Sequence, residues 1–137
     1  MLRDEYILLT AALIQATKAN LIKWSSSCCR SLSYTAQPTP NQIVEIGVYY
    51  SIDDNNVSTT CLDFTVFTSE QKVIDEIVLC RGDDTGLFNP LEELYKEAKT
   101  QFTIASNPHI PIILKDIAQS LATQLENAES IKTPKNP

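Results

Sequence analysis

The chain of 137 residues is predicted to fold as an α+β domain, in the order helix, three strands, helix, helix. Apolar residues recur at helical spacing near the start and after residue 89, whereas apolar and polar residues alternate between them. Hydrophobic residues make up 43% of the chain, enough for a core, and three glycines are few for a β-sandwich with many tight turns. We therefore expect a three-stranded antiparallel meander over residues 1–128 with helices on one face, and a disordered polar tail over residues 129–137.

Residues 4–24 are predicted to form the first helix, since Asp4 and Glu5 suit the positive end of its dipole. The helix is apolar nearly all round, which is typical of a helix buried on several sides. We expect it to pair with a second copy of the chain and form a homodimer. The residues expected to mediate this self-association are Tyr6, Leu9, Leu13 and Ala16. The apolar run 6–14 is too short to cross a bilayer, and the acids before it argue against an export signal.

Residues 25–42 are rich in Ser, Thr and Pro, which indicates a linker or loop within the domain. Pro38 and Pro40 disfavour helix at the residues that precede them. Residues 43–52 and 57–68 then alternate as two strands joined by a turn at 53–56, which predicts an antiparallel hairpin. Residues 69–81 fit either a helix or a third strand. We favour the strand, because a two-stranded hairpin is only marginally stable alone.

The last third of the chain is predicted to form two helices. Asn89 is the expected N-cap of the first, with Pro90 at its first helical position. Pro111 opens the second, which is expected to reach Asn127. The side chains expected to bury one face of this last helix are Ile113, Leu114, Ile117, Leu121 and Leu125.

The charge of the chain is −6 and is unevenly placed. No cluster of Lys and Arg predicts binding to nucleic acid or to an anionic membrane. Residues 41–93 hold eleven acids against only Lys72 and Arg81. An acidic surface often serves only solubility, but it can also dock a basic protein partner. The residues expected to form that docking surface are Asp53, Asp54, Asp63, Asp75, Glu76, Asp83 and Asp84.

Four cysteines are expected to remain free thiols in the cytoplasm, because a chain of this length needs no disulfide to fold. Cys61 and Cys80 lie on predicted strands and could be cross-strand neighbours. Cys28 and Cys29 lie in the Ser-rich segment beside Arg30, which could stabilise a thiolate, so a redox or modification role is an alternative for this pair.

The sequence contains no recognised catalytic arrangement. The single histidine, His109, lies in a connector, and the spacing of His and Cys matches no zinc signature. Phosphate-binding and hydrolase motifs are absent from the sequence. We therefore expect no catalytic residues, no metal and no cofactor.

Three functional hypotheses remain. The first is a non-catalytic protein-interaction or accessory domain, chaperone-like or immunity-like, that binds a basic partner. The second is a small-molecule-binding domain or atypical enzyme with a pocket between sheet and helices. Its expected lining groups are Tyr49, Tyr50, Tyr95 and His109. The third is a structural subunit of a larger assembly.

Overall fold

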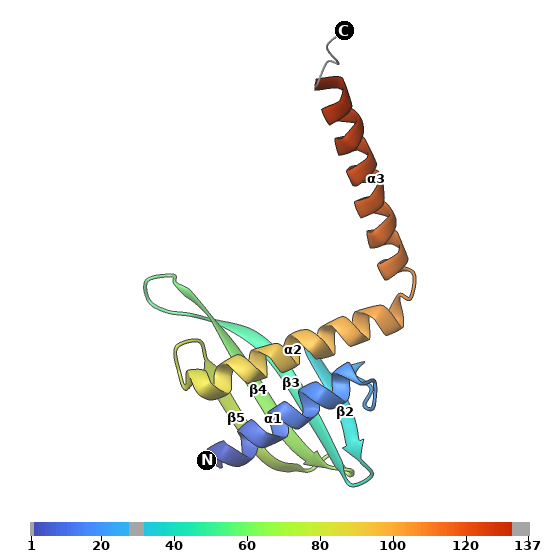
Figure 1. Ribbon diagram of the computed structural model, residues 1–137. Helices are drawn as coiled ribbons and strands as arrows, with labels where there is room; N and C mark the ends of the chain where they lie inside the picture. Colours follow the sequence, from blue (N-terminus) through green and yellow to red (C-terminus); the bar gives the residue numbers. More distant parts are fainter. Residues whose placement is uncertain (1, 28–31, 133–137) are drawn as a thin grey trace. The chain divides into compact units, whose positions relative to one another are not determined.

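The computed structural model describes residues 2–27 and 32–132, which form three helices and five strands (Figure 1). The elements are α1 (Arg3–Lys18), β1 (Ser25–Ser26), β2 (Ser33–Thr39), β3 (Gln42–Ile52), β4 (Ser58–Thr68), β5 (Val73–Cys80), α2 (Thr85–Ser106) and α3 (Ile110–Lys132). The chain divides into two compact units. Met1–Phe102 holds the sheet, and Thr103–Pro137 holds α3. Residues 1–128 are expected to form one domain, whereas α3 continues to Lys132, past the expected start of the tail at residue 129.

The sheet is an antiparallel meander in the order β1-β2-β3-β4-β5, so the α+β class is confirmed, but the expected number of three strands is wrong. Part of the expected linker over 25–42 forms β1 and β2 instead. The signal was the alternation of Tyr34 and Ala36, whose side chains are buried. Pro38 is tolerated because it lies where the register between β2 and β3 shifts, so a regular ladder does not need its missing N–H.

The middle strands follow the sequence prediction closely. β3 and β4 pair from Gln42↔Thr68 to Ile52↔Ser58, and residues 69–81 contain the strand β5 rather than a helix. The register aligns apolar side chains across the sheet in rows. One such row consists of Tyr34, Ile46, Phe64 and Ile77, all buried. These rows form the floor of the hydrophobic core.

Helix α1 ends at Lys18, six residues before the predicted end at residue 24. Asn20 adopts a left-handed backbone conformation with φ of 57°. The N–H of Leu21 donates to the carbonyl of Ala16 at 2.9 Å, and that of Asn20 donates to Thr17 at 3.0 Å. This is the Schellman pattern that terminates helices, with Asn as the residue that tolerates the left-handed position.

Helix α2 begins at Thr85, five residues before the predicted start at Pro90, which lies inside the helix. The carbonyl of Asp84 accepts the N–H of Phe88 at 2.8 Å, so Asp84 rather than Asn89 caps the helix. Pro90 is the sixth residue of the helix and removes the hydrogen bond that an N–H at this position would give to the carbonyl of Gly86. The signal that the sequence offered was Asp84 itself, a favoured N-cap residue.

Helices α1 and α2 lie on the same face of the sheet (Figure 1). Hydrogen bonds and an ion pair join the two helices. Arg3 in α1 donates two hydrogen bonds to the carboxylate of Asp84, at 2.6 and 3.0 Å. Lys18 forms an ion pair with Glu93 at 3.3 Å. In the loop after α1, the N–H of Trp24 donates to the side-chain amide oxygen of Gln101 at 2.8 Å. The amide nitrogen of Gln101 donates to the carbonyl of Ile22. These polar links hold the two helices over the core.

Within its own unit, the face of the last helix that was expected to be buried is uncovered. Its five large side chains (Ile113, Leu114, Ile117, Leu121 and Leu125) are 52–65% exposed. No residue described after Phe102 belongs to the core of the sheet unit. The periodicity correctly predicts a helix with one apolar face, but it does not say what covers that face.

The expectation that all four cysteines are free thiols is also wrong, because Cys61 and Cys80 form a disulfide. They are direct cross-strand partners on β4 and β5, with Cα atoms 3.9 Å apart. The N–H of Arg81 donates to the carbonyl of Thr60 at 2.8 Å, so this is a non-hydrogen-bonded pair, in which side chains approach most closely. Cys28 and Cys29 lie outside the described residues. The disulfide removes the main support for a cytoplasmic location.

Reducing the disulfide should destabilise the sheet unit. It closes a loop between residues 19 positions apart, and cross-linking a loop of this size is worth about 3 kcal/mol in the free energy of unfolding. Urea denaturation of the oxidised and the reduced chain would measure the loss. A Cys61→Ala/Cys80→Ala variant should have the same denaturation midpoint as the reduced chain, and added reductant should not change that midpoint. Equal midpoints for the oxidised and reduced chain would contradict the assignment.

Candidate functional site

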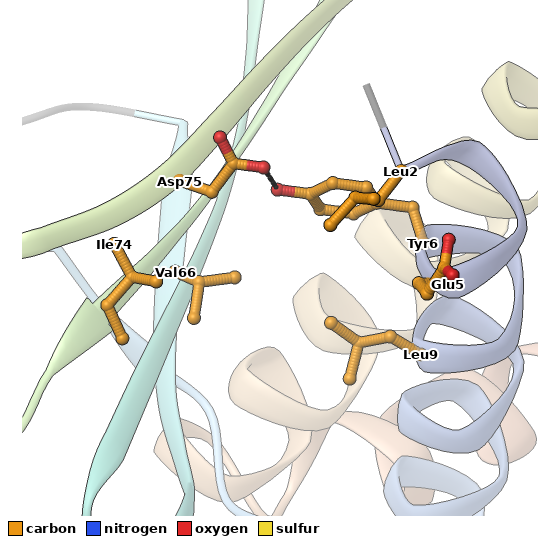
Figure 2. A pocket seen from close by; sticks show the side chains of 7 residues that line it. All are labelled: Leu2, Glu5, Tyr6, Leu9, Val66, Ile74 and Asp75. Atoms are coloured by element: carbon orange, nitrogen blue, oxygen red, sulfur yellow. Dashed lines mark hydrogen bonds between the residues drawn. The ribbon is translucent and has the colours of Figure 1, made fainter.

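A hollow of about 170 Å³ lies between the start of α1 and the β4–β5 side of the sheet (Figure 2). We call it the α1–β5 hollow. It is lined by Leu2, Glu5, Tyr6, Leu9, Val66, Ile74 and Asp75. Five of the seven side chains are aliphatic or aromatic, and the two carboxylates stand on opposite elements, one on α1 and one on β5. The hollow can therefore accept an apolar side chain next to a positive charge.

A hydrogen bond between Tyr6 and Asp75 joins the two walls of the hollow. The Tyr6 hydroxyl donates to Oδ2 of Asp75 at 2.5 Å (Figure 2). The Tyr6 ring also packs edge-on against Phe64 in the core, with centroids 6.0 Å apart. Burial, and then the hydrogen bond and charge of Asp75, raise the pKa of Tyr6 well above its ordinary value. The phenol therefore stays a neutral donor and anchors the carboxylate in place.

Strand β5 borders the hollow and forms one edge of the sheet. Because Cys80 is in a non-hydrogen-bonded pair, the backbone N–H and C=O of Glu76 and Val78 point away from β4. At the end of the strand, a side-chain oxygen of Asp83 accepts the N–H of Cys80 at 2.8 Å and covers that part of the edge. Among the described strands, none pairs with the rest of this edge. An open edge can receive an extended segment of another chain.

The seven acids expected to form one docking surface do not lie together. They are distributed as follows: Asp53 and Asp54 in the β3–β4 turn, Asp75 in the α1–β5 hollow, Asp63 and Glu76 on the opposite face of the sheet, and Asp83 and Asp84 between β5 and α2. Several have structural roles. Asp53 accepts the backbone N–H groups of Asn55 and Val57 within its own turn.

Two of the remaining acids are also engaged within the fold. Asp84 pairs with Arg3, which holds the pKa of its carboxyl below the ordinary value. Asp63 is only 5% exposed. Asp75 and Glu76 are therefore the members of the set best placed beside an accessible hollow and an open edge.

The four residues expected to mediate self-association face the core of their own unit. Tyr6 and Leu13 are buried, whereas Leu9 and Ala16 are partly buried against the core. Their placement gives no support to pairing through α1. Exposed apolar side chains occur on several elements, and five of them form one face of α3. We call these five residues (Ile113, Leu114, Ile117, Leu121 and Leu125) the α3 stripe.

The groups expected to line a ligand pocket are divided. Tyr50 and Tyr95 line a second pocket between the β3–β4 hairpin and α2, while Tyr49 points to the other face of the sheet. His109 belongs to the second unit. Neither Cys61 nor Cys80 can act as a thiolate nucleophile while they form a disulfide. Within the described residues, no group of His, Cys, Asp and Glu side chains could hold a metal ion.

Sequence reasoning missed the lining residues Leu2, Glu5, Val66 and Ile74. Val66 and Ile74 were recognised as strand residues, but the sequence does not say which sheet edge a helix leaves uncovered. Together, the described residues define a class: an α+β domain with an acid-flanked hollow, an open sheet edge and an uncovered amphipathic helix. No protein-family model, curated protein or solved structure matches the chain. None of the helices in the described part is long and apolar enough for a membrane span.

The two buried tyrosines should make the fold sensitive to alkali. Burial, with smaller effects of Tyr34 and Tyr50, raises the pKa of Tyr95 to about 12, and Tyr6 is shifted in the same direction. In the unfolded chain both phenols lose their protons near pH 10. The unfolded state therefore binds fewer protons than the folded state above that pH, and stability falls as pH rises. In chemical denaturation above pH 10, the free energy of unfolding of Tyr95→Phe should fall less steeply with pH than that of the wild-type chain. An unchanged slope would contradict the assignment.

Proposed function

We propose that the chain is a non-catalytic protein-interaction domain that pairs with a second copy of itself through α3. The observation that carries this proposal is the α3 stripe, whose side chains are at least half exposed. Contiguous apolar surface of this kind marks an interface, because its transfer from water drives association. Burying each large aliphatic side chain contributes about 1.5–3 kcal/mol. A stripe of five is therefore sufficient for a stable helix pair.

Lys115 and Glu126 lie on the side of α3 away from the stripe, so they do not set the direction of the pair. If two helices cross antiparallel near Leu121, Ile117 of one copy meets Leu125 of the other.

The α1–β5 hollow supports the second part of the proposal, which is that the domain binds a basic protein segment. An extended segment added to the open edge of β5 would place alternate side chains against Val78 and Glu76. An apolar side chain would enter the hollow, and its basic neighbours, which point to the opposite face of the sheet, would meet Glu76. The acids on this edge also protect it from self-pairing of the sheet, which is the simpler reason for their presence.

Replacing one stripe residue should weaken pairing strongly. Leu121→Asp puts two carboxylates at the centre of the helix pair and removes two buried leucines. We expect a loss of about 3 kcal/mol, or roughly 100-fold in the dissociation constant. Sedimentation velocity over a range of concentrations would measure the mass against the 15.3 kDa of one chain.

The matched control is Ile112→Asp, which replaces an equally exposed aliphatic residue on the other side of α3. It should leave the pairing constant unchanged. A wild-type chain that remains at the mass of one copy at all concentrations would overturn the proposal. Equal effects of the two variants would show that pairing does not use the stripe.

Binding of a basic segment can be tested with an acetylated Lys-Val-Lys-Val-Lys-Val-Lys peptide in an NMR titration at low salt. We expect the amide shifts to centre on β5 and the start of α1. Glu76→Lys should weaken binding about tenfold, and high salt should remove this difference. The single variant Glu97→Lys, on α2, should have little effect. Equal binding of a Glu-Val peptide of the same length would contradict this part of the proposal.

A further inference from the structure

A second pocket, of about 300 Å³, lies at the opposite end of the same sheet face from the start of α1. The β3–β4 hairpin continues past the point where α2 crosses the sheet (Figure 1), and the pocket lies between the hairpin and α2. Its floor consists of Val48, Leu62 and Tyr95, all of which are buried. Tyr50 extends the apolar wall toward solvent. The interior therefore suits an apolar ligand body of modest size.

The rim of this pocket is basic, although the chain as a whole carries a charge of −6. Three of the eleven Lys and Arg residues of the chain line it, namely Arg81, Lys96 and Lys99. The lining contains one acid, Glu92, which accepts a hydrogen bond from Arg81 at 2.6 Å and lies 3.7 Å from Lys96. One carboxylate cannot neutralise three cations, so the rim keeps an excess of positive charge.

The position of Arg81 on the rim is fixed by its neighbours. Arg81 directly follows Cys80 of the disulfide, and the guanidinium stacks over the ring of Phe88 at 5.6 Å from its centroid. Glu92 holds the same guanidinium from α2. Thr60 and Leu62, which flank Cys61, line the pocket as well. The disulfide lies on the opposite face of the sheet, where it joins β4 to β5 behind the pocket.

We propose that this pocket binds a small amphipathic carboxylate, with its apolar body on Val48, Leu62 and Tyr95 and its carboxylate at the Arg81, Lys96 and Lys99 rim. A guanidinium with two ammonium groups favours an anion, and the planar guanidinium matches a carboxylate in particular. The buried floor excludes ligands that are charged throughout, because their polar groups would lose water without gaining partners. This site is separate from the α3 stripe and from the α1–β5 hollow.

The test is an NMR titration of the isotopically labelled chain with octanoate below its micelle-forming concentration. Octylammonium and 1-octanol serve as probes with the same apolar body and a different head group. We expect saturable amide shifts at Val48, Leu62, Tyr95 and the neighbouring rim with octanoate, binding about tenfold weaker with octanol, and no saturable shifts with octylammonium.

Two double variants with the same net charge separate the rim from the overall charge of the chain. Lys96→Gln/Lys99→Gln should weaken octanoate binding about tenfold, whereas Lys23→Gln/Lys72→Gln should leave it unchanged. Equal binding of octylammonium, shifts centred away from the pocket, or equal effects of the two double variants would each overturn the proposal.

Discussion

The antiparallel register of β3 and β4 is the constraint on which the rest of the structure depends. Eleven residue pairs run without a shift from Gln42↔Thr68 to Ile52↔Ser58. Because side chains alternate between the faces of a strand, this register places Ile46 and Phe64 on the same face, and a slip of one residue would expose them. The same register extends through β5 and aligns Cys61 with Cys80. Core and disulfide thus depend on one pattern of pairing.

The sheet face that carries Ile46 and Phe64 sets the positions of α1 and α2, of the α1–β5 hollow and of the second pocket. Two helices cover the middle of the face, and the sheet is longer than the surface that they cover. The α1–β5 hollow and the second pocket, whose rim is basic, lie at the two places where a helix meets the uncovered part of the sheet. They differ in charge, since carboxylates flank the first and Lys and Arg surround the second. The fold therefore offers two sites of opposite electrostatic character, one suited to a basic segment and one to an anion.

The sequence predicted the elements with strong local patterns. The alternation in β3 and β4 and the Asp–Asn turn between them were recognised because each depends on neighbouring residues alone. The end of α1 was missed because the apolar run continues through Ile22 and Trp24, which are buried in a loop rather than in a helix. The strand β2 was missed because Ser and Thr are common in linkers. In β2 they alternate with Tyr34 and Ala36, and Tyr34 packs on Tyr95 and Phe102.

The candidate site could be predicted only in part, for a physical reason. The seven acids of the predicted docking surface are spread over the fold, because their positions depend on which strand is at the edge and where α1 begins on the sheet. The α3 residues were identified correctly as one apolar face. Whether such a face is buried in its own chain depends on the area that the remaining core offers. In this chain α1 and α2 already supply the helical part of the core.

The central claim is that the α3 stripe becomes buried by association between copies. Amide hydrogen exchange of the intact chain at a low and a high concentration tests it directly, because exchange reports local opening residue by residue. We expect the amides of α3 to exchange more slowly at the higher concentration, while those of β3 and β4 exchange at the same slow rate in both. Identical exchange of α3 at the two concentrations would contradict it.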